Sequence, residues 1–216
     1  TFCSEELGGF YLDILKDRLY TAPADSRVRR SAQNALYQIT HVLARLMAPI
    51  LSFTAQEVWE LLAPGEASVF EQTWLDIKLP RDAASLRGRW TQLRTLRGDV
   101  TKRLEELRSA GKIGSSLAGD VDLYAEGDAA TLLQSLDDDL RFVFITSRAT
   151  VHAGSADDAI ETALPGVRLK VSASPHAKCE RCWHYRADVG HQAEHPQLCG
   201  RCTGNLYGAG EPRSHA

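Results

Sequence analysis

Four cysteines near the end of the sequence have the spacing of a metal site. They form two Cys-x2-Cys pairs with 16 residues between them, namely Cys179, Cys182, Cys199 and Cys202. Two residues between cysteines let a tight turn direct both sulfurs at one ion, and two such turns complete a tetrahedron. In a chain without signs of export this spacing favours a metal over a disulfide or redox pair. Four thiolates leave no open coordination position, so the spacing predicts a structural zinc ion.

Three histidines lie between the two cysteine pairs, so a site of three cysteines and one histidine is an alternative. They are His184, His191 and His195. Because four cysteines already satisfy the metal, we expect these histidines to be exposed or hydrogen-bonded to the loop.

Aromatic and basic side chains surround the first cysteine pair. Trp183 follows Cys182 directly, and its basic neighbours are Lys178, Arg181 and Arg186. Rings beside cations can stack on unpaired bases and contact phosphates, so these four residues are candidate RNA contacts. Packing of Trp183 over the metal turn is an equally good interpretation.

The charge distribution adds a second candidate surface. The chain of 216 residues has a net charge of −3, but residues 16–49 carry +4 and residues 86–112 carry +5. An RNA footprint requires local positive charge, which a neutral total can hide. We therefore add five candidate RNA contacts where the first two helices meet, although a charge run is commonly a solvated helix face. They are Lys16, Arg18, Arg27, Arg29 and Arg30.

Hydrophobic periodicity predicts a mainly α fold. Helices are expected over residues 7–19 with Ser4 as N-cap, over 28–46, from a Thr54–Glu57 capping box to Leu62, and over 86–107. Strands are expected near residues 121–125 and 167–171, with a short helix over 128–136. We divide the chain into a helical domain (1–112), a small α+β junction domain (113–173) and a zinc-binding module (174–216). The sequence has neither a signal peptide nor a membrane span, so we expect a soluble, cytoplasmic protein.

Five stretches in the same order resemble one family of class I aminoacyl-tRNA synthetases. The stretches are FYLDILKDRLYT (10–21), RRSAQNALYQI (29–39), MAPILSFTAQEVW (47–59), KIGSSL (112–117) and KCERCWHY with CGRC (178–185 and 199–202). They look like the C-terminal region of bacterial isoleucyl-tRNA synthetase. The first three are shared in looser form with the valyl and leucyl enzymes, whereas KIGSSL and the cysteine module favour the isoleucyl enzyme.

The resemblance implies that residues 1–112 form the anticodon-binding domain and that the four cysteines are zinc ligands. It implies three further properties: binding to the anticodon stem-loop of tRNA(Ile), covalent continuity with the rest of a synthetase, and a monomeric state without membrane contact. The full enzyme activates isoleucine with ATP, but the HIGH and KMSKS motifs and the editing domain are missing here. KIGSS at 112–116 lacks the second lysine of KMSKS and follows a long helix, so we interpret it as a helix-to-strand connection. We therefore expect this chain to be unable to aminoacylate.

Two other function classes remain as alternatives. DNA-repair glycosylases end in a related four-cysteine finger, but they need an N-terminal catalytic proline or lysine, which this sequence does not show. A zinc-stabilised protein-interaction module without an RNA role is the third interpretation.

Overall fold

The first half of the chain is a series of helices. The computed structural model describes residues 1–154 and 156–215. The helices of this half are η1 (Phe2–Leu12), α1 (Asp13–Thr21), α2 (Arg27–Met47), α3 (Ser52–Leu62), the 3-10 turn η2 (Val69–Glu71) and α4 (Ala83–Ser109). η1 is wound as a π-helix and runs directly into α1. The breaks that the predicted helix ranges imply, after residue 19 and after residue 46, are confirmed within one or two residues. The Ser26 side chain caps α2 by accepting a hydrogen bond from the Arg29 amide.

Two of the predicted helix caps are wrong. Ser4 lies inside η1, which begins at Phe2, and its hydroxyl donates to the carbonyl of Thr1 (3.2 Å) instead of accepting from an amide. Helix α3 begins at Ser52, before the expected cap at Thr54. A tight turn already starts this helix, because the Leu51 amide donates to the Met47 carbonyl (2.7 Å). The capping box is therefore not needed.

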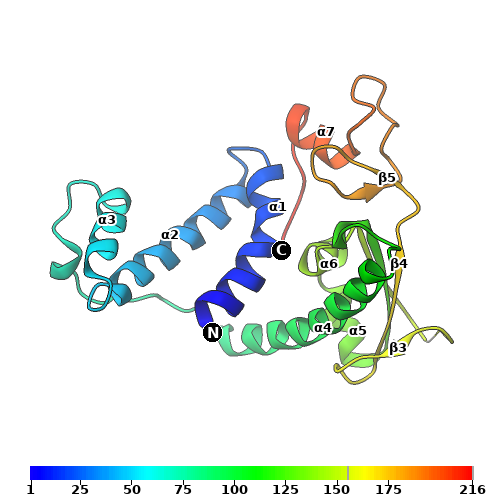
Figure 1. The fold of residues 1–216 in the computed structure, drawn as a ribbon, viewed down its shortest axis with the longest axis horizontal. Coiled ribbons are helices and arrows are strands. Elements are labelled where there is room, and N and C mark those ends of the chain that lie inside the picture. The colour runs from blue at the N-terminus through cyan, green and yellow to red at the C-terminus, as the bar shows by residue number, and fades with distance from the viewer. Residues whose placement is uncertain (155, 216) are drawn as a thin grey trace.

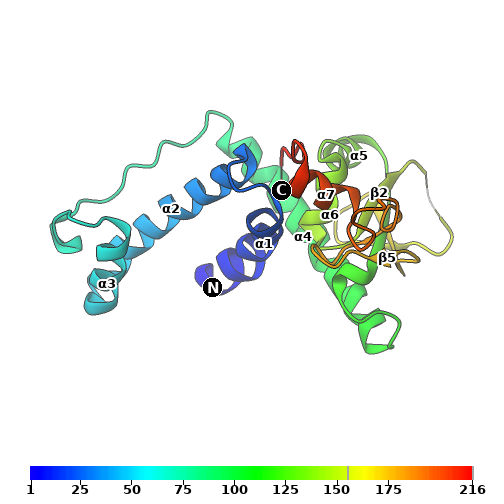
Figure 2. The same ribbon diagram turned by 90° about the horizontal axis from the view of Figure 1, so that it is seen from above.

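Helices α2 and α3 form an arm that extends away from the sheet-containing part of the molecule (Figure 1). Its small core centres on Trp59, which is 1% exposed and donates from Nε1 to the carbonyl of Ala67 (2.8 Å). The segment between α3 and α4 returns along the arm (Figure 2). Large apolar side chains remain exposed on the arm, among them Ile50, Phe53, Leu61, Phe70, Trp74 and Leu79.

A four-stranded sheet with helices on one side forms the second part. The strands are β1 (Gly119–Ala125), β2 (Arg148–His152), β3 (Ile160–Glu161) and β4 (Val167–Ala173), in the order β2-β1-β4-β3. The connections contain the 3-10 turns η3 (Ser116–Ala118) and η4 (Asp137–Asp139) and the helices α5 (Gly127–Gln134) and α6 (Leu140–Phe144). β1 pairs in parallel with β2 and antiparallel with β4. The predicted strands β1 and β4 and the short helix are confirmed, and β2 and β3 were not predicted.

Helix α4 packs on this sheet and shares its core. Leu93, Leu96, Val100 and Leu104 of α4 belong to the same buried cluster as the sheet residues. Helix α4 therefore contributes to the core of the α+β part, although the predicted boundary assigns it to the helical domain. The division of the chain at residue 112 stays a prediction.

The last part is a module held by its cysteines. It contains β5 (Ala177–Lys178), β6 (Tyr185–Arg186) and α7 (Gly200–Tyr207), and it lies beside α1 and α6 (Figure 1). Helices account for most of the regular structure, so the mainly α fold with a small sheet and a cysteine module is confirmed. Within residues 1–154 and 156–215 the structure has no helix that is both long and apolar enough to cross a membrane.

Candidate metal centre and nucleic-acid interface

The four cysteine sulfurs converge on one point. All four side chains are buried, and their Sγ atoms lie within 4.8 Å of one another. The Sγ atoms of Cys182 and Cys199 are 3.7 Å apart, well beyond the disulfide bond length of about 2.05 Å. Four sulfurs at about 2.3 Å from a tetrahedral zinc ion would be separated by about 3.8 Å. The donor set and its spacing therefore fit zinc.

Hydrogen-bond donors and a helix end favour thiolates at this cluster. The Cys199 amide donates to Sγ of Cys179 (3.3 Å), and the Arg181 guanidinium approaches Sγ of Cys202 (3.8 Å). Cys199 is also the N-cap of α7, where the helix dipole favours negative charge. Hydrogen bonds from Cys179, then Cys199 and Cys202, lower the pKa of Cys182 far below its ordinary value.

The hydrogen bonds among the cysteines oppose ionisation of all four thiols at once. Hydrogen bonds with Cys179, Cys182 and Cys199 raise the pKa of Cys202. One thiolate that accepts from neighbouring thiols is stable here, but four buried thiolates without a cation would repel one another. A divalent ion is the partner that allows all four to ionise.

The two cysteine turns differ in their backbone. In the first turn, the Trp183 amide donates to the Cys179 carbonyl (2.9 Å), and Trp183 has a φ of 65°, in the left-handed region. In the second, Gly200 donates its amide to the Asp188 carboxylate (2.9 Å). A Cβ atom at Gly200 would come within 2.8 Å of that carboxylate, so a larger residue here would displace the Asp188 side chain.

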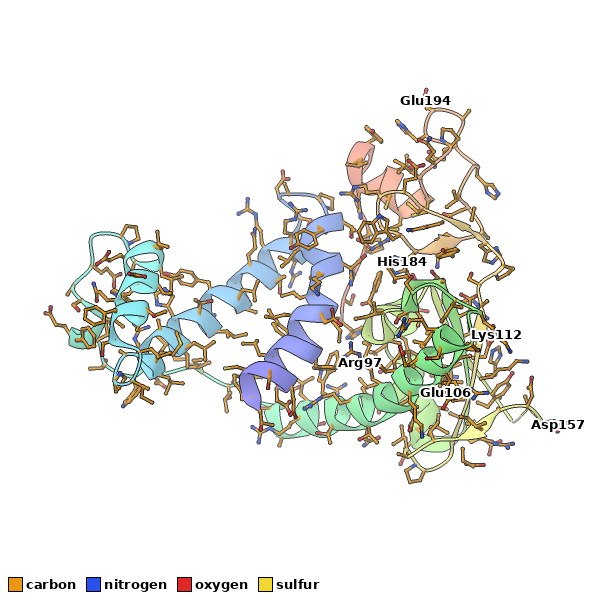
Figure 3. The ribbon with its side chains drawn as sticks, viewed as in Figure 1. Arg97, Glu106, Lys112, Asp157, His184 and Glu194 are labelled. Atoms are coloured by element: carbon orange, nitrogen blue, oxygen red, sulfur yellow. The ribbon has the colours of Figure 1, made fainter. Side chains whose placement is uncertain are left out.

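The histidines of the module have structural contacts. His184 (Figure 3) is buried, and its Nδ1 lies 3.1 Å from the Cys182 carbonyl oxygen. Its ring makes a T-shaped contact with the ring of Phe142. His195 stacks on the ring of Tyr207 at 4.1 Å between centroids. Among the described residues, the four cysteines are the potential metal ligands that converge here, and no histidine is among them.

Arginines attach the cysteine module to the C-terminal end of α1. Arg181 donates to the backbone carbonyls of Thr21 (2.9 Å) and Tyr20 (3.3 Å), which are free acceptors at a helix end. Arg201 donates two hydrogen bonds to the carboxylate of Asp17 in a bidentate ion pair, at 2.8 and 2.9 Å. Burial alone would raise the pKa of Asp17, but the hydrogen bond and charge of Arg201 hold it well below its ordinary value.

A hollow with a volume of about 450 Å³ lies between α1, the start of the α+β part and the first cysteine turn. Its mostly apolar lining consists of Asp13, Ile14, Lys16, Asp17, Tyr20, Thr21, Leu117, Phe142, Ile145, Arg181, Cys182, Trp183 and His184. Two lining rings remain accessible, Tyr20 at 74% and Trp183 at 59% exposure. The ammonium group of Lys178 lies over the Trp183 ring, 5.3 Å from its centroid. Trp183 is thus an exposed ring with a cation beside it.

The predicted basic contacts fall into two groups. Lys16, Arg27, Arg30 and Lys178 are exposed, and Lys16 also lines the hollow, where it pairs with Asp13 (3.0 Å). Others are half-buried: Arg18, Arg29, Arg181 and Arg186.

Two of the half-buried arginines bind the protein itself. Arg181 holds the end of α1, as described above, and Arg186 donates to the Ser147 carbonyl (3.3 Å). Their roles as RNA contacts stay predictions.

Several residues that build this region were not predicted. Tyr20, Asp17 and Phe142 line the hollow, and Asp139 lies buried below it. The Asp137–Asp139 run suggests a solvated helix end, which is wrong for Asp139. The sequence gives a weak signal for Tyr20, which is a tyrosine next to a polar turn. The others depend on contacts with residues more than 40 positions away, for which a single sequence has no signal.

Comparison with known proteins explains this arrangement. A family model described as the anticodon-binding domain of tRNA ligase matches residues 1–123. The chain belongs to this family. A second model, described as the zinc finger found in FPG and IleRS, matches residues 178–203 and so spans all four cysteines.

The relatives of this chain are isoleucine–tRNA ligases. Over 225 aligned residues the chain is 54% identical to the isoleucine–tRNA ligase of Bordetella pertussis, covering all of this chain and 23% of that protein. Over 220 residues it is 55% identical to the isoleucine–tRNA ligase of Cupriavidus pinatubonensis, covering all of this chain and 22% of that protein. The resemblance to the isoleucyl enzymes is therefore confirmed, and the chain spans less than a quarter of their length.

Proposed function

We propose that this chain is the tRNA-binding part of an isoleucine–tRNA ligase and that it binds the anticodon stem-loop of tRNA(Ile). The match to the anticodon-binding family over residues 1–123 carries this proposal. The exposed rings at the hollow beside the cysteine module support it, because unpaired bases of an RNA loop stack on such rings. A DNA-repair glycosylase tail is not favoured, since the ligase relatives cover the whole chain.

Zinc is the ion that we assign to the four cysteines. Cys179, Cys182, Cys199 and Cys202 would hold it through four thiolates, and it would supply no catalysis because no coordination position stays open. Its role is to fold a module that lacks an apolar core of its own. Among the residues that the structure describes, Val189 and Leu198 are the partly buried apolar side chains packed against the cysteine cluster.

We assign the RNA contacts to the side chains around the hollow that remain accessible. Trp183 and Tyr20 both line it with exposed rings and suit stacking on unpaired bases. Lys16 and Lys178 lie beside these rings and suit phosphates. The exposed Arg27 and Arg30 on α2 continue this positive surface along the arm. In this assignment the half-buried arginines support the surface from beneath.

Substitution of Trp183 tests the proposal. Base–aromatic stacking is worth about 1–3 kcal/mol per base, so Trp183→Ala is expected to weaken tRNA(Ile) binding by about 5- to 150-fold. Trp74→Ala is the matched control, because Trp74 is 68% exposed on the segment that follows α3. Binding is measured by filter retention or anisotropy with isoleucine tRNA, a mismatched tRNA and duplex DNA at two salt concentrations. Equal, salt-independent binding to all three ligands would instead support a protein-interaction module.

The activity of the whole ligase needs parts that this chain does not supply. We infer that the chain alone does not activate isoleucine with ATP, which a pyrophosphate-exchange assay checks directly. The exposed apolar side chains of the arm, such as Phe53 at 88% and Leu61 at 85%, support packing of the remaining ligase chain there. Amide exchange in α3 should then be slower in the full-length ligase than in this chain. We further propose a monomeric, cytoplasmic protein.

A further inference from the structure

The segment that follows α7 runs back to α1 instead of extending into solvent (Figure 1). Its first residues are anchored on α7, because the Glu211 amide donates to the side-chain oxygen of Asn205 (2.8 Å) and the Asn205 amide group donates back to Glu211 (2.9 Å). Gly210, with a φ of 84°, passes so close to Pro23 that a Cβ atom would lie 2.9 Å from the proline ring. The segment therefore lies against the turn between α1 and α2.

Arg213 of this segment is fully enclosed where three parts of the molecule meet. Its side chain is 0% exposed, and it donates to the carboxylate of Asp17 on α1 at 2.6 Å. Its guanidinium lies over the ring of Phe142 on α6 at 3.5 Å, and its Nε is 4.0 Å from Asp139. The next two amides, those of Ser214 and His215, donate to the same Asp139 carboxylate at 3.0 and 2.7 Å.

Two of the residues that Arg213 contacts also line the hollow. Asp17 and Phe142 both line the hollow, and Arg201 of the cysteine module binds the same Asp17 carboxylate. Arg201 also faces the Phe142 ring, 5.0 Å from its centroid. One carboxylate thus joins α1, the cysteine module and the returning segment.

A planar guanidinium suits this position better than other side chains. Its fork of donors can serve Asp17 while its face stacks on Phe142, which the point charge of a lysine cannot do. Enclosed charge networks contribute geometric specificity rather than large net stability, since desolvation offsets much of the attraction. The expected effect of changing Arg213 is therefore a looser junction between folded parts.

We infer that Arg213 is a positioning residue that holds the cysteine module against α1 and so keeps Trp183 in place at the hollow. The contacts above join the returning segment, α1 and α6, and the placement of Trp183 is what the inference adds. Its consequence for RNA binding rests on the proposed function. The segment 209–215 is accordingly part of the binding unit, although its buried arginine touches no RNA.

The docking is tested without RNA by fluorine NMR of protein labelled with 5-fluorotryptophan. The chain has four tryptophans, and the Trp183 resonance is assigned by Trp183→Phe. In Arg213→Ala this resonance is expected to shift or broaden, because Trp183 is next to His184, whose ring contacts the Phe142 ring that Arg213 covers. Arg89→Ala is the control, since Arg89 is an exposed arginine of α4 whose ion pair with Asp82 spans 3.8 Å. Zinc content is measured on every variant to show that the cysteine module is folded.

The effect on RNA is tested by a double-mutant cycle with tRNA(Ile). Arg213→Ala is expected to weaken binding about tenfold, and Arg213→Lys to restore only part of it, where tenfold corresponds to about 1.4 kcal/mol. In the Trp183→Ala background the same change should cost less than about twofold, because Arg213 acts through that ring. If Arg213→Ala does not fold, Asp139→Asn takes its place. It removes the charge near Arg213 and keeps an oxygen for the two amides.

Two results would overturn the inference. One is an unmoved Trp183 resonance in zinc-loaded Arg213→Ala, and the other is an equal loss of affinity with and without the Trp183 ring. Failure of the wild-type chain to bind any tRNA would overturn the proposed function instead. The NMR comparison would then still decide whether Arg213 positions the module.

Discussion

Removal of one zinc ligand should unfold the cysteine module and leave the rest of the chain folded. The side chains that pack on the cysteine cluster are Val189 and Leu198, and a fully buried aliphatic side chain contributes only about 1.5–3 kcal/mol. Zinc binding in such modules is worth on the order of 10 kcal/mol, which is comparable to the stability of a whole domain. Cys199→Ser should therefore abolish ordered structure between residues 178 and 207. The core shared by α4 and the sheet contains no cysteine and should persist.

Hydrogen exchange with mass spectrometry resolves the two regions in one experiment. Peptides from 178–207 should exchange at the rate of an unfolded chain in Cys199→Ser, and peptides from α4 and β1 should keep their protection. Cys3→Ser is the matched control, because Cys3 is exposed and outside the cluster. Elemental analysis should find about one zinc per wild-type or Cys3→Ser chain. Retained protection of 178–207 in Cys199→Ser, or a metal-free but folded wild type, would refute the reasoning.

Three further predictions concern the other parts of the chain. Trp59→Ala should cost about 3–5 kcal/mol in the arm, seen as faster amide exchange in α2 and α3 with α4 unaffected, because Trp59 fills the small core there. Leu96→Ala, at a side chain that is 0% exposed, should lower the free energy of unfolding of the α+β part by about 2–5 kcal/mol in urea titrations. Burial would raise the pKa of Asp122, but hydrogen bonds from Arg148 and His152 hold it below its ordinary value. The stability that Asp122 contributes is thus present above the ordinary carboxyl pKa of about 3.9 and is lost as pH falls below it, so the stability difference between wild type and Asp122→Asn should shrink below about pH 4.

Features with a local signal were predictable from the sequence. The spacing of the cysteines located the cluster that could hold a metal ion, and apolar periodicity located α2, α4, β1 and β4. The helix ends were less predictable. Ser4 and the Thr54–Glu57 pair have the right residue types for caps, but Ser4 and Thr54 each lie inside a helix that begins two residues earlier. Edge strands such as β2 were missed because a five-residue segment with half-buried side chains has little periodicity.

The junction between the parts was beyond prediction for a different reason. Asp17 contacts Arg201 and Arg213, which lie 184 and 196 positions further along the chain. No periodicity or spacing connects residues so far apart. On α1 alone, Asp17 looks like any polar residue of a helix. The sequence therefore predicted the exposed cations and Trp183 of the candidate interface. It did not predict the buried charged residues that hold these parts together.

The left-handed backbone at Trp183 sets stability and recognition against each other at one position. An L-residue in that conformation costs roughly 1–2 kcal/mol relative to glycine, which offsets much of what the ring gains from its buried part. Screening for heat resistance alone would therefore exert little selection for the tryptophan ring that we propose for base stacking. Consensus or thermostability engineering of this module should therefore leave residue 183 unchanged.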